Sequence, residues 1–206
     1  MAEPQPAQPV DYARLIAERS KAVEGATKRL YENLPAYRSY VNPNNPRDTA
    51  QQRMGEAVRA TWMHGDPVRG MIEELAKAKG VDPDIIHALA AVEQHGNMTP
   101  GDYSKKSGAG AAGLMQLTPE TAKRWNANVD DPRDSIRAAV DVVAELSERL
   151  GTKDPLFIAA AYNAGDKVVR DYAQAVNDLP LETKNYVAMF DIARTAIQDP
   201  NRKGTK

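Results

Sequence analysis

Residues 85–116 read IIHALAAVEQHGNMTPGDYSKKSGAGAAGLMQ, and the rest of the chain is interpreted around this stretch. Its first part, residues 85–92, is an apolar helical pattern that ends at Glu93. The part from residue 96 to residue 113 is small, polar and rich in glycine, which breaks helical periodicity. The stretch therefore predicts a helix that ends in a carboxylate and faces a flexible loop.

The side chains around Glu93 suggest a chemical role for its carboxyl group. Ile86, Leu89 and Ala90 lie one and two helical turns before it. A carboxyl group held against apolar neighbours loses hydration, so its protonated form is favoured and it can act as a general acid near neutral pH. A boundary glutamate that simply points to water fits the same residues, and the two interpretations remain open at this point.

The totals of the chain exclude several classes of function. With 206 residues the chain can bury a core, and one domain with an appendage is expected. The net charge of -1 gives no electrostatic footprint for nucleic acid, and the absence of cysteine excludes disulfides and thiol catalysis. The longest apolar run, residues 156–162, is too short for a membrane span.

Proline and oxygen-bearing caps punctuate the chain and predict an all-α fold. A cap oxygen can accept a backbone N–H, and proline fits the first helical position, where no N–H is needed. Five helix starts show this pattern: Asp66-Pro67, Asp82-Pro83, Thr118-Pro119, Asp131-Pro132 and Asp154-Pro155. No alternating strand pattern of useful length competes with it.

Helical periodicity sets the remaining boundaries. The predicted helices before residue 81 cover residues 11–34, with Gly25 as an interruption, then 49–64, and then 67 onward to Gly80, with a turn-rich linker over residues 35–46. The predicted later helices are a long one that ends at Gly151, a short one over residues 156–164 that stops at Gly165, and a last one over residues 181–197. Three prolines in residues 1–10 predict a disordered tail.

Two further segments could contribute to a site. In the segment from Ser107 to Gln116, the Gln116 amide can donate and accept hydrogen bonds, and Met115 offers an adaptable apolar surface for a sugar. A flexible loop followed by ordinary core residues is the alternative. Tyr162 and Asn163 lie at a helix end that can reach a cleft, although Asn163 with the glycine after it could equally form a helix cap.

Taken together, these pieces resemble the soluble lytic transglycosylases, whose fold is related to goose-type lysozyme. The motifs are Gly113-Leu-Met-Gln116 after a glutamate-terminated helix, Ala161-Tyr162-Asn163-Ala-Gly165, and Glu182-Thr-x-x-Tyr186. The resemblance spans roughly residues 81–196 and implies a lysozyme-like helical domain. The implied division is a tail over residues 1–10, a helical docking or assembly extension over 11–80, the lytic transglycosylase domain over 81–198, and a polar tail over 199–206.

The resemblance also implies roles for individual residues. Glu93 would be the catalytic acid and base, Ser107 would form a hydrogen bond near it, and Tyr186 would lie close to it. The residues expected to line the sugar subsites are Met115, Gln116, Tyr162 and Asn163. The chain departs from the family at Gln94, where the family usually has serine, and the loop that follows is expected to be rearranged.

The family implies cleavage of the bond between N-acetylmuramic acid and N-acetylglucosamine in peptidoglycan, with closure of a 1,6-anhydro ring. No metal or organic cofactor follows from this reaction. His64, His87 and His95 do not form a zinc-type spacing. One alternative is a hydrolytic goose-type muramidase, which needs a second acid such as Asp102. The other is an inactive glycan-binding or structural virion protein.

The N-terminal residues bear on localisation and partners. Residues 1–9 lack a basic start and an apolar core, so no Sec-type signal peptide is expected. The absence of such a signal is consistent with a virion-associated bacteriophage protein that acts in the host periplasm or cell wall. The alternative is a protein exported by a route other than Sec. The expected partners are peptidoglycan strands and, through residues 11–80, other virion or secretion-system proteins.

Overall fold

The computed structural model describes residues 12–39, 54, 55, 58, 67–94, 103 and 106–199, and its regular elements there are all helices. They are α1 (Tyr12–Ser39), α3 (Pro67–Lys79), α4 (Pro83–Glu93), α5 (Pro119–Arg124), α6 (Pro132–Leu150), α7 (Pro155–Ala164), α8 (Asp166–Ala173) and α9 (Leu181–Gln198). Strand pairing in these residues is limited to isolated bridges. The predicted all-α class is therefore confirmed.

The predicted helix starts owe their positions to side-chain caps. Asp82, Thr118, Asp131 and Asp154 each accept a backbone N–H from the first turn, and proline follows each of them. The Asp154 carboxylate, for example, accepts from the N–H of Phe157 at 2.9 Å. These four starts are confirmed, and the fifth cap, Asp66, lies outside the described residues although α3 begins at Pro67 as predicted.

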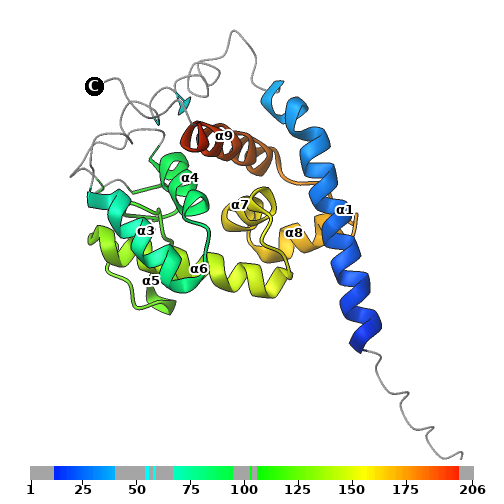
Figure 1. Ribbon diagram of the computed structural model, residues 1–206, viewed down its shortest axis with the longest axis horizontal. Coiled ribbons are helices and arrows are strands. Elements are labelled where there is room, and N and C mark those ends of the chain that lie inside the picture. The colour runs from blue at the N-terminus through cyan, green and yellow to red at the C-terminus, as the bar shows by residue number, and fades with distance from the viewer. Residues whose placement is uncertain are drawn as a thin grey trace, which may run out of the picture.

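Helix α7 forms the centre of the core. Its residues Leu156 to Ala161 are all buried, so the helix is apolar around most of its circumference, as expected for a helix surrounded by others. It packs against α9, α8 and α6, and Figure 1 shows it nearly end-on among its neighbours. Helix α7 thus places Tyr162 and Asn163, near its C-terminal end, close to the helices packed around it.

The packing of α4 against α9 fixes the position of the predicted acid. Residues 85–92 of α4 are buried without interruption. The two helices run antiparallel, because Asp84 near the start of α4 accepts from Gln198 at the end of α9, at 2.9 Å, while Glu93 contacts Tyr186. Glu93 therefore lies at the last residue of α4, beside the early turns of α9.

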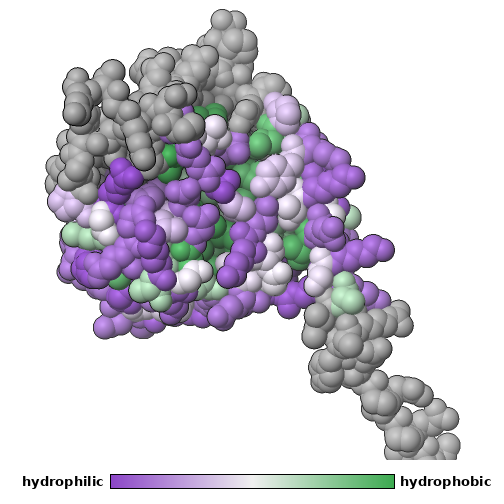
Figure 2. All heavy atoms as spheres, in the orientation of Figure 1, coloured by the Kyte–Doolittle hydropathy of each residue, from purple (hydrophilic) through white to green (hydrophobic). Residues whose placement is uncertain are grey.

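Helix α1 covers the side of the molecule formed by α7, α8 and α9. Its buried residues, Val23, Ala26, Leu30 and Leu34, recur at helical spacing. The Arg29 side chain donates to the carbonyl of Tyr172 at 2.8 Å and lies 5.0 Å from the centre of its ring. Figure 2 shows a hydrophilic outer side of α1 and hydrophobic residues between it and the rest of the molecule.

Helix α3 is likewise packed into the same core. Val68, Ile72 and Ala76 are buried, and the helix lies against α6 and α4. The apolar faces of α1 and α3 are thus covered by the helices that follow them. The division at residue 81 and the docking role of residues 11–80 stay predictions, but both helices have a structural role as well.

The structure corrects two predicted boundaries and adds one helix that was not predicted. Helix α1 continues through Gly25 and Pro35, so residues 35–39 of the predicted linker are helical. Pro35 is exposed, and it removes the helical hydrogen bond that its missing N–H would have made. Helix α8 was not predicted; it begins directly after Gly165 and buries Val169, Tyr172 and Ala173.

The predicted helix over residues 49–64 lies largely outside the described residues. Met54, Gly55 and Val58 within it are helical, and the side chains of Met54 and Val58 are buried. None of the described helices combines the length and the apolar character needed to cross a membrane.

Replacement of Leu30 by alanine tests the structural role of α1. Leu30 is fully buried, so Leu30→Ala should lower the free energy of unfolding by about 2–5 kcal/mol. Val176→Ala is the control, because Val176 is 63% exposed and its truncation should change stability little. Urea denaturation of the two variants measures both values; equal effects would show that α1 does not belong to the folded core.

Candidate active site

The carboxyl group of Glu93 is partly buried where α4 ends. Burial raises the pKa of Glu93 to about 7, and a hydrogen bond from the hydroxyl of Tyr186 partly opposes this shift. The distance between Tyr186 Oη and Glu93 Oε1 is 2.6 Å. A carboxyl group with a pKa near 7 is present in both protonation states at neutral pH, so it can donate a proton and take one back.

Two tyrosines surround this carboxyl group and remain neutral. Burial raises the pKa of Tyr186 and of Tyr162 well above the usual value, and the negative charge of Glu93 adds to both shifts. Tyr186 can therefore act as a hydrogen-bond donor to Glu93 across the whole range of working pH. The Tyr162 hydroxyl donates to the main-chain carbonyl of Met115 at 2.9 Å.

A tight turn over residues 113–116 lies beside the end of α4. Ala112 and Leu117 exchange two backbone hydrogen bonds of 3.0 Å across it. Gly113 and Gln116 both have positive φ, 78° and 45°, and the Gln116 amide donates back to the carbonyl of Gly113 at 2.9 Å. Glycine suits the first of these positions, whereas Gln116 adopts a conformation that is unusual for a residue with a side chain.

Side chains from three helices attach to the main chain of this turn. Gln94, directly after α4, donates to the carbonyls of Gly113 and Leu114. Ser135 on α6 accepts from the N–H of Met115 at 3.3 Å, and Tyr162 on α7 binds the carbonyl of Met115. Sequence reasoning missed Ser135; its only signal was a serine in the buried face of an otherwise apolar helix.

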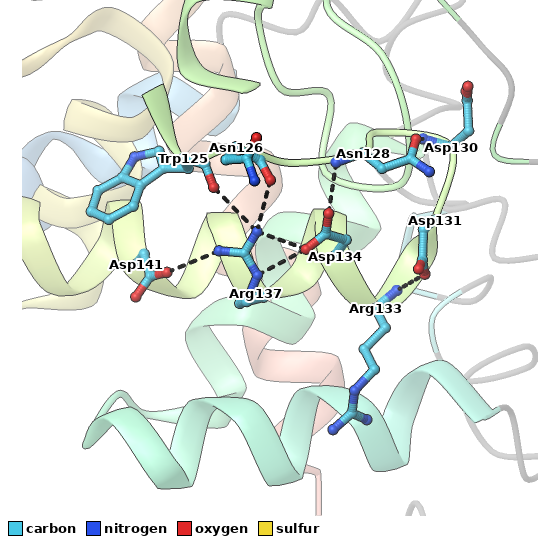
Figure 3. A network of polar contacts seen from close by, with 9 residues as sticks. All are labelled: Trp125, Asn126, Asn128, Asp130, Asp131, Arg133, Asp134, Arg137 and Asp141. Atoms are coloured by element: carbon cyan, nitrogen blue, oxygen red, sulfur yellow. Dashed lines mark hydrogen bonds and ion pairs between the residues drawn. The ribbon is translucent and has the colours of Figure 1, made fainter. Parts of the chain in front are cut away.

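The loop before α6 supports the turn from behind. A Cβ atom at Gly113 would lie 2.1 Å from the carbonyl oxygen of Val129, so only glycine permits this close approach. Arg137 holds the loop, as Figure 3 shows, because its guanidinium group donates to the Trp125 carbonyl at 3.2 Å and to the Asp134 carboxylate at 2.6 Å. The other oxygen of Asp134 accepts from the N–H of Asn128 at 2.7 Å.

Three of the predicted site residues contact each other or Glu93 directly in the structure. Tyr186 contacts Glu93, and Tyr162 contacts the main chain of Met115. Asn163 and Gln116 are half-buried at the end of α7 and in the turn. Their sugar-binding roles stay predictions.

The side chains of Ser107 and Met115 make contacts other than the predicted ones in this structure. Ser107 is exposed, and its hydroxyl accepts from the N–H of Ala111 at 3.0 Å, which stabilises the glycine-rich loop. The Met115 side chain is fully buried in the core, so in this structure the residue contributes to the site through its main chain. The predicted bond of Ser107 near Glu93 and the sugar contact of the Met115 side chain stay predictions.

Of the remaining candidates, only His87 lies in the part of the chain that the structure describes. Asp102, His64 and His95 lie outside the described residues. His87 is buried in α4 and contacts Glu73 of α3 at 3.3 Å; burial lowers its pKa to about 4, so it is neutral at physiological pH. The described part of the chain contains no group of three or more histidine, aspartate or glutamate side chains that could hold a metal ion.

A hollow of about 380 Å³ lies near the start of α4, at the opposite end of this helix from Glu93. Its lining includes Asp82 and Ile85 of the α4 start, together with Val143 and Glu148 of α6. It is therefore separate from the candidate active site.

The chain belongs to the Transglycosylase SLT domain family, whose model matches residues 70–185, more than half of the sequence. The family match begins within α3 and includes Glu93, the turn at 113–116 and the Tyr162–Asn163 pair. The predicted family is thereby confirmed.

One similar solved structure is an inactive mutant of the lytic transglycosylase Slt from Pseudomonas aeruginosa. The two chains are 24% identical with a TM-score of 0.43, and the match covers 63% of this chain and 22% of that chain. The match thus spans about a fifth of the length of that protein.

Gly113→Ala tests the close approach between the turn and the loop before α6. The added Cβ would collide with the Val129 carbonyl and also sit at positive φ, whereas Gly151→Ala adds only the strain of positive φ because nothing lies within 4 Å. Gly113→Ala should therefore cost about 1–3 kcal/mol more stability than Gly151→Ala. Chemical denaturation provides the comparison, and equal losses would show that the turn can move away from Val129 freely.

Glu93→Gln tests the burial of the acid through stability. Between pH 4.5, the ordinary pKa of glutamate, and about 7, folded Glu93 holds a proton that the unfolded chain has released, so the free energy of unfolding falls as pH rises. The loss reaches at most about 3 kcal/mol, and glutamine does not incur it. Relative to wild type, the variant should gain stability between pH 4 and pH 8; a difference independent of pH in urea denaturation would contradict the raised pKa.

Proposed function

We propose that this protein is a peptidoglycan lytic transglycosylase in which Glu93 is both the acid and the base. The observation that carries the proposal is a partly buried carboxyl group with a pKa near 7 that accepts a hydrogen bond from a neutral tyrosine. Membership of the Transglycosylase SLT domain family supports the same reaction class. The bond cleaved is the β-1,4 linkage between N-acetylmuramic acid and N-acetylglucosamine.

The reaction proceeds in two proton transfers on one carboxyl group. Protonated Glu93 gives its proton to the glycosidic oxygen while the bond from that oxygen to the muramic C1 breaks. The resulting Glu93 carboxylate then takes the proton of the muramic C6 hydroxyl, whose oxygen forms the new bond to C1. Glu93 ends protonated and ready for the next cycle, and no water is consumed.

The environment of Glu93 suits both halves of this cycle. Desolvation favours the protonated carboxyl group that starts the reaction, because a charge is poorly stabilised there. The Tyr186 hydroxyl, at 2.6 Å, stabilises the carboxylate that exists between the two transfers. The substrate acetamide can stabilise the positive charge at C1, so the reaction needs no second carboxylate.

Glu93→Gln is the direct test of the assigned role. An amide can serve neither as acid nor as base, so the variant should fold and lose at least ~10²-fold in the rate of muropeptide release from purified sacculi. Circular dichroism of the same preparation establishes folding. A folded variant that retains substantial cleavage would remove Glu93 from the mechanism.

Mass spectrometry of the released fragments separates this reaction from hydrolysis. The proposal requires 1,6-anhydromuramic ends and expects Asp102→Asn to change the rate little. A goose-type muramidase would instead leave reducing ends and would depend on a second acid to activate water. Reducing ends together with an inactive Asp102→Asn variant would establish that alternative.

A further inference from the structure

Gln94 stands directly after the proposed acid and is almost completely buried, with 1% of its surface exposed. It caps the end of α4, and its backbone N–H bonds to the carbonyl of Ala90 at 3.0 Å. A buried amide side chain is costly unless its polar atoms are paired. The hydrogen-bond partners of the Gln94 side chain therefore indicate its structural role.

Both partners of the Gln94 amide lie in the turn over residues 113–116. Nε2 donates to the carbonyl of Leu114 at 2.8 Å and to that of Gly113 at 3.2 Å. Because both partners are carbonyl oxygens, only the NH2 end of the side chain can satisfy them. A serine, which stands here in the family that the sequence resembles, has one hydroxyl proton and could donate only once.

Three side chains from described residues outside this turn bind its main chain, and Gln94 is the one that directly follows Glu93 in the sequence. The other two attachments, Ser135 and Tyr162, come from α6 and α7. Any displacement between α4 and the turn must therefore break the Gln94 bonds or carry Glu93 along. The position of Glu93 relative to the turn is thus fixed by a side chain one residue away from it.

We propose that Gln94 is a positioning residue that holds Glu93 in register with the turn over residues 113–116. The inference rests on the proposed function, together with the expectation that Gln116 of this turn lines a sugar subsite. Gln94 itself touches no reacting atom; it acts through Glu93 and the turn. Its loss should reduce turnover because a misplacement of about 1 Å can cost ~10²-fold in rate.

Gln94→Met and Gln94→Glu form the test, with Gln174→Met and Gln174→Glu as matched controls. Gln174 also caps a helix, and its N–H likewise bonds four residues back at 3.0 Å, but its side chain is exposed. Methionine matches the length of glutamine without donors, so Gln94→Met should lower kcat at least ~10-fold with a smaller change in KM. The Gln174 variants should match wild type.

The Gln94→Glu variant provides a readout that general damage would not produce. A protonated carboxylic acid at this position keeps one donor for the Leu114 carbonyl, whereas its ionised form has none and is repelled by both carbonyls. Turnover should therefore approach wild type near pH 5 and fall more steeply than wild type towards pH 8. If Gln94→Met does not fold, an unaltered pH profile of Gln94→Glu still overturns the proposal.

A measurement without turnover separates this inference from the proposed function. Carboxyl carbon NMR follows the pKa of Glu93, which should move from about 7 towards its ordinary value of 4.5 in Gln94→Met, because a loosened turn admits water. A wild-type enzyme without cleavage would refute the proposed function alone. A folded Gln94→Met with wild-type kcat and an unchanged Glu93 pKa would refute the role of Gln94.

Discussion

The hydrogen bond from Tyr186 to Glu93 joins the two helices on which the site depends. It forms only because α4 and α9 pack antiparallel, so that the last residue of one helix meets the second turn of the other. The uninterrupted burial of residues 85–92 maintains this packing. The apolar face of α4 therefore serves the stability of the core and the position of the acid at the same time.

The burial of Glu93 also lowers the stability of the folded protein. A carboxyl group that is partly removed from water destabilises the native state at neutral pH, and the Tyr186 hydroxyl offsets this only in part. The turn beside it adds strain of a different kind, because Gln116 adopts a positive φ and Gly113 lies against the Val129 carbonyl. Strained features of this kind persist where the surrounding structure holds them in place. Here the side-chain hydrogen bonds of Gln94, Ser135 and Tyr162 hold the main chain of the turn.

Local chemistry made much of the fold predictable from the sequence. Cap residues followed by proline located four helix starts, because a cap bond involves neighbours within three residues. Helix α8 was missed since its pattern is only eight residues long and follows Gly165 immediately. The linker prediction began too early because the helical conformation of α1 continues through Pro35 to Ser39.

The candidate site was predictable only in part for a related reason. Glu93, Tyr162 and Tyr186 stand in recognisable motifs, and the structure gives each a contact within the site. The buried bonds of Gln94 and Ser135 join residues about twenty positions apart, and no periodicity in the sequence reports such pairs. Polar residues in apolar surroundings were the only hint, and their partners required the fold.

The packing of α1 has a consequence for how the chain reaches its native state. Arg29 and Tyr31 contact residues 143 and 123 positions further along the chain. During synthesis, the apolar stripe of α1 emerges long before α7, α8 and α9 exist to cover it. Contacts of such large sequence separation form slowly, and uncovered apolar surface invites aggregation in the meantime. Among the described helices, α1 is thus made first but is among the last to be packed, and chaperone demand should concentrate on it.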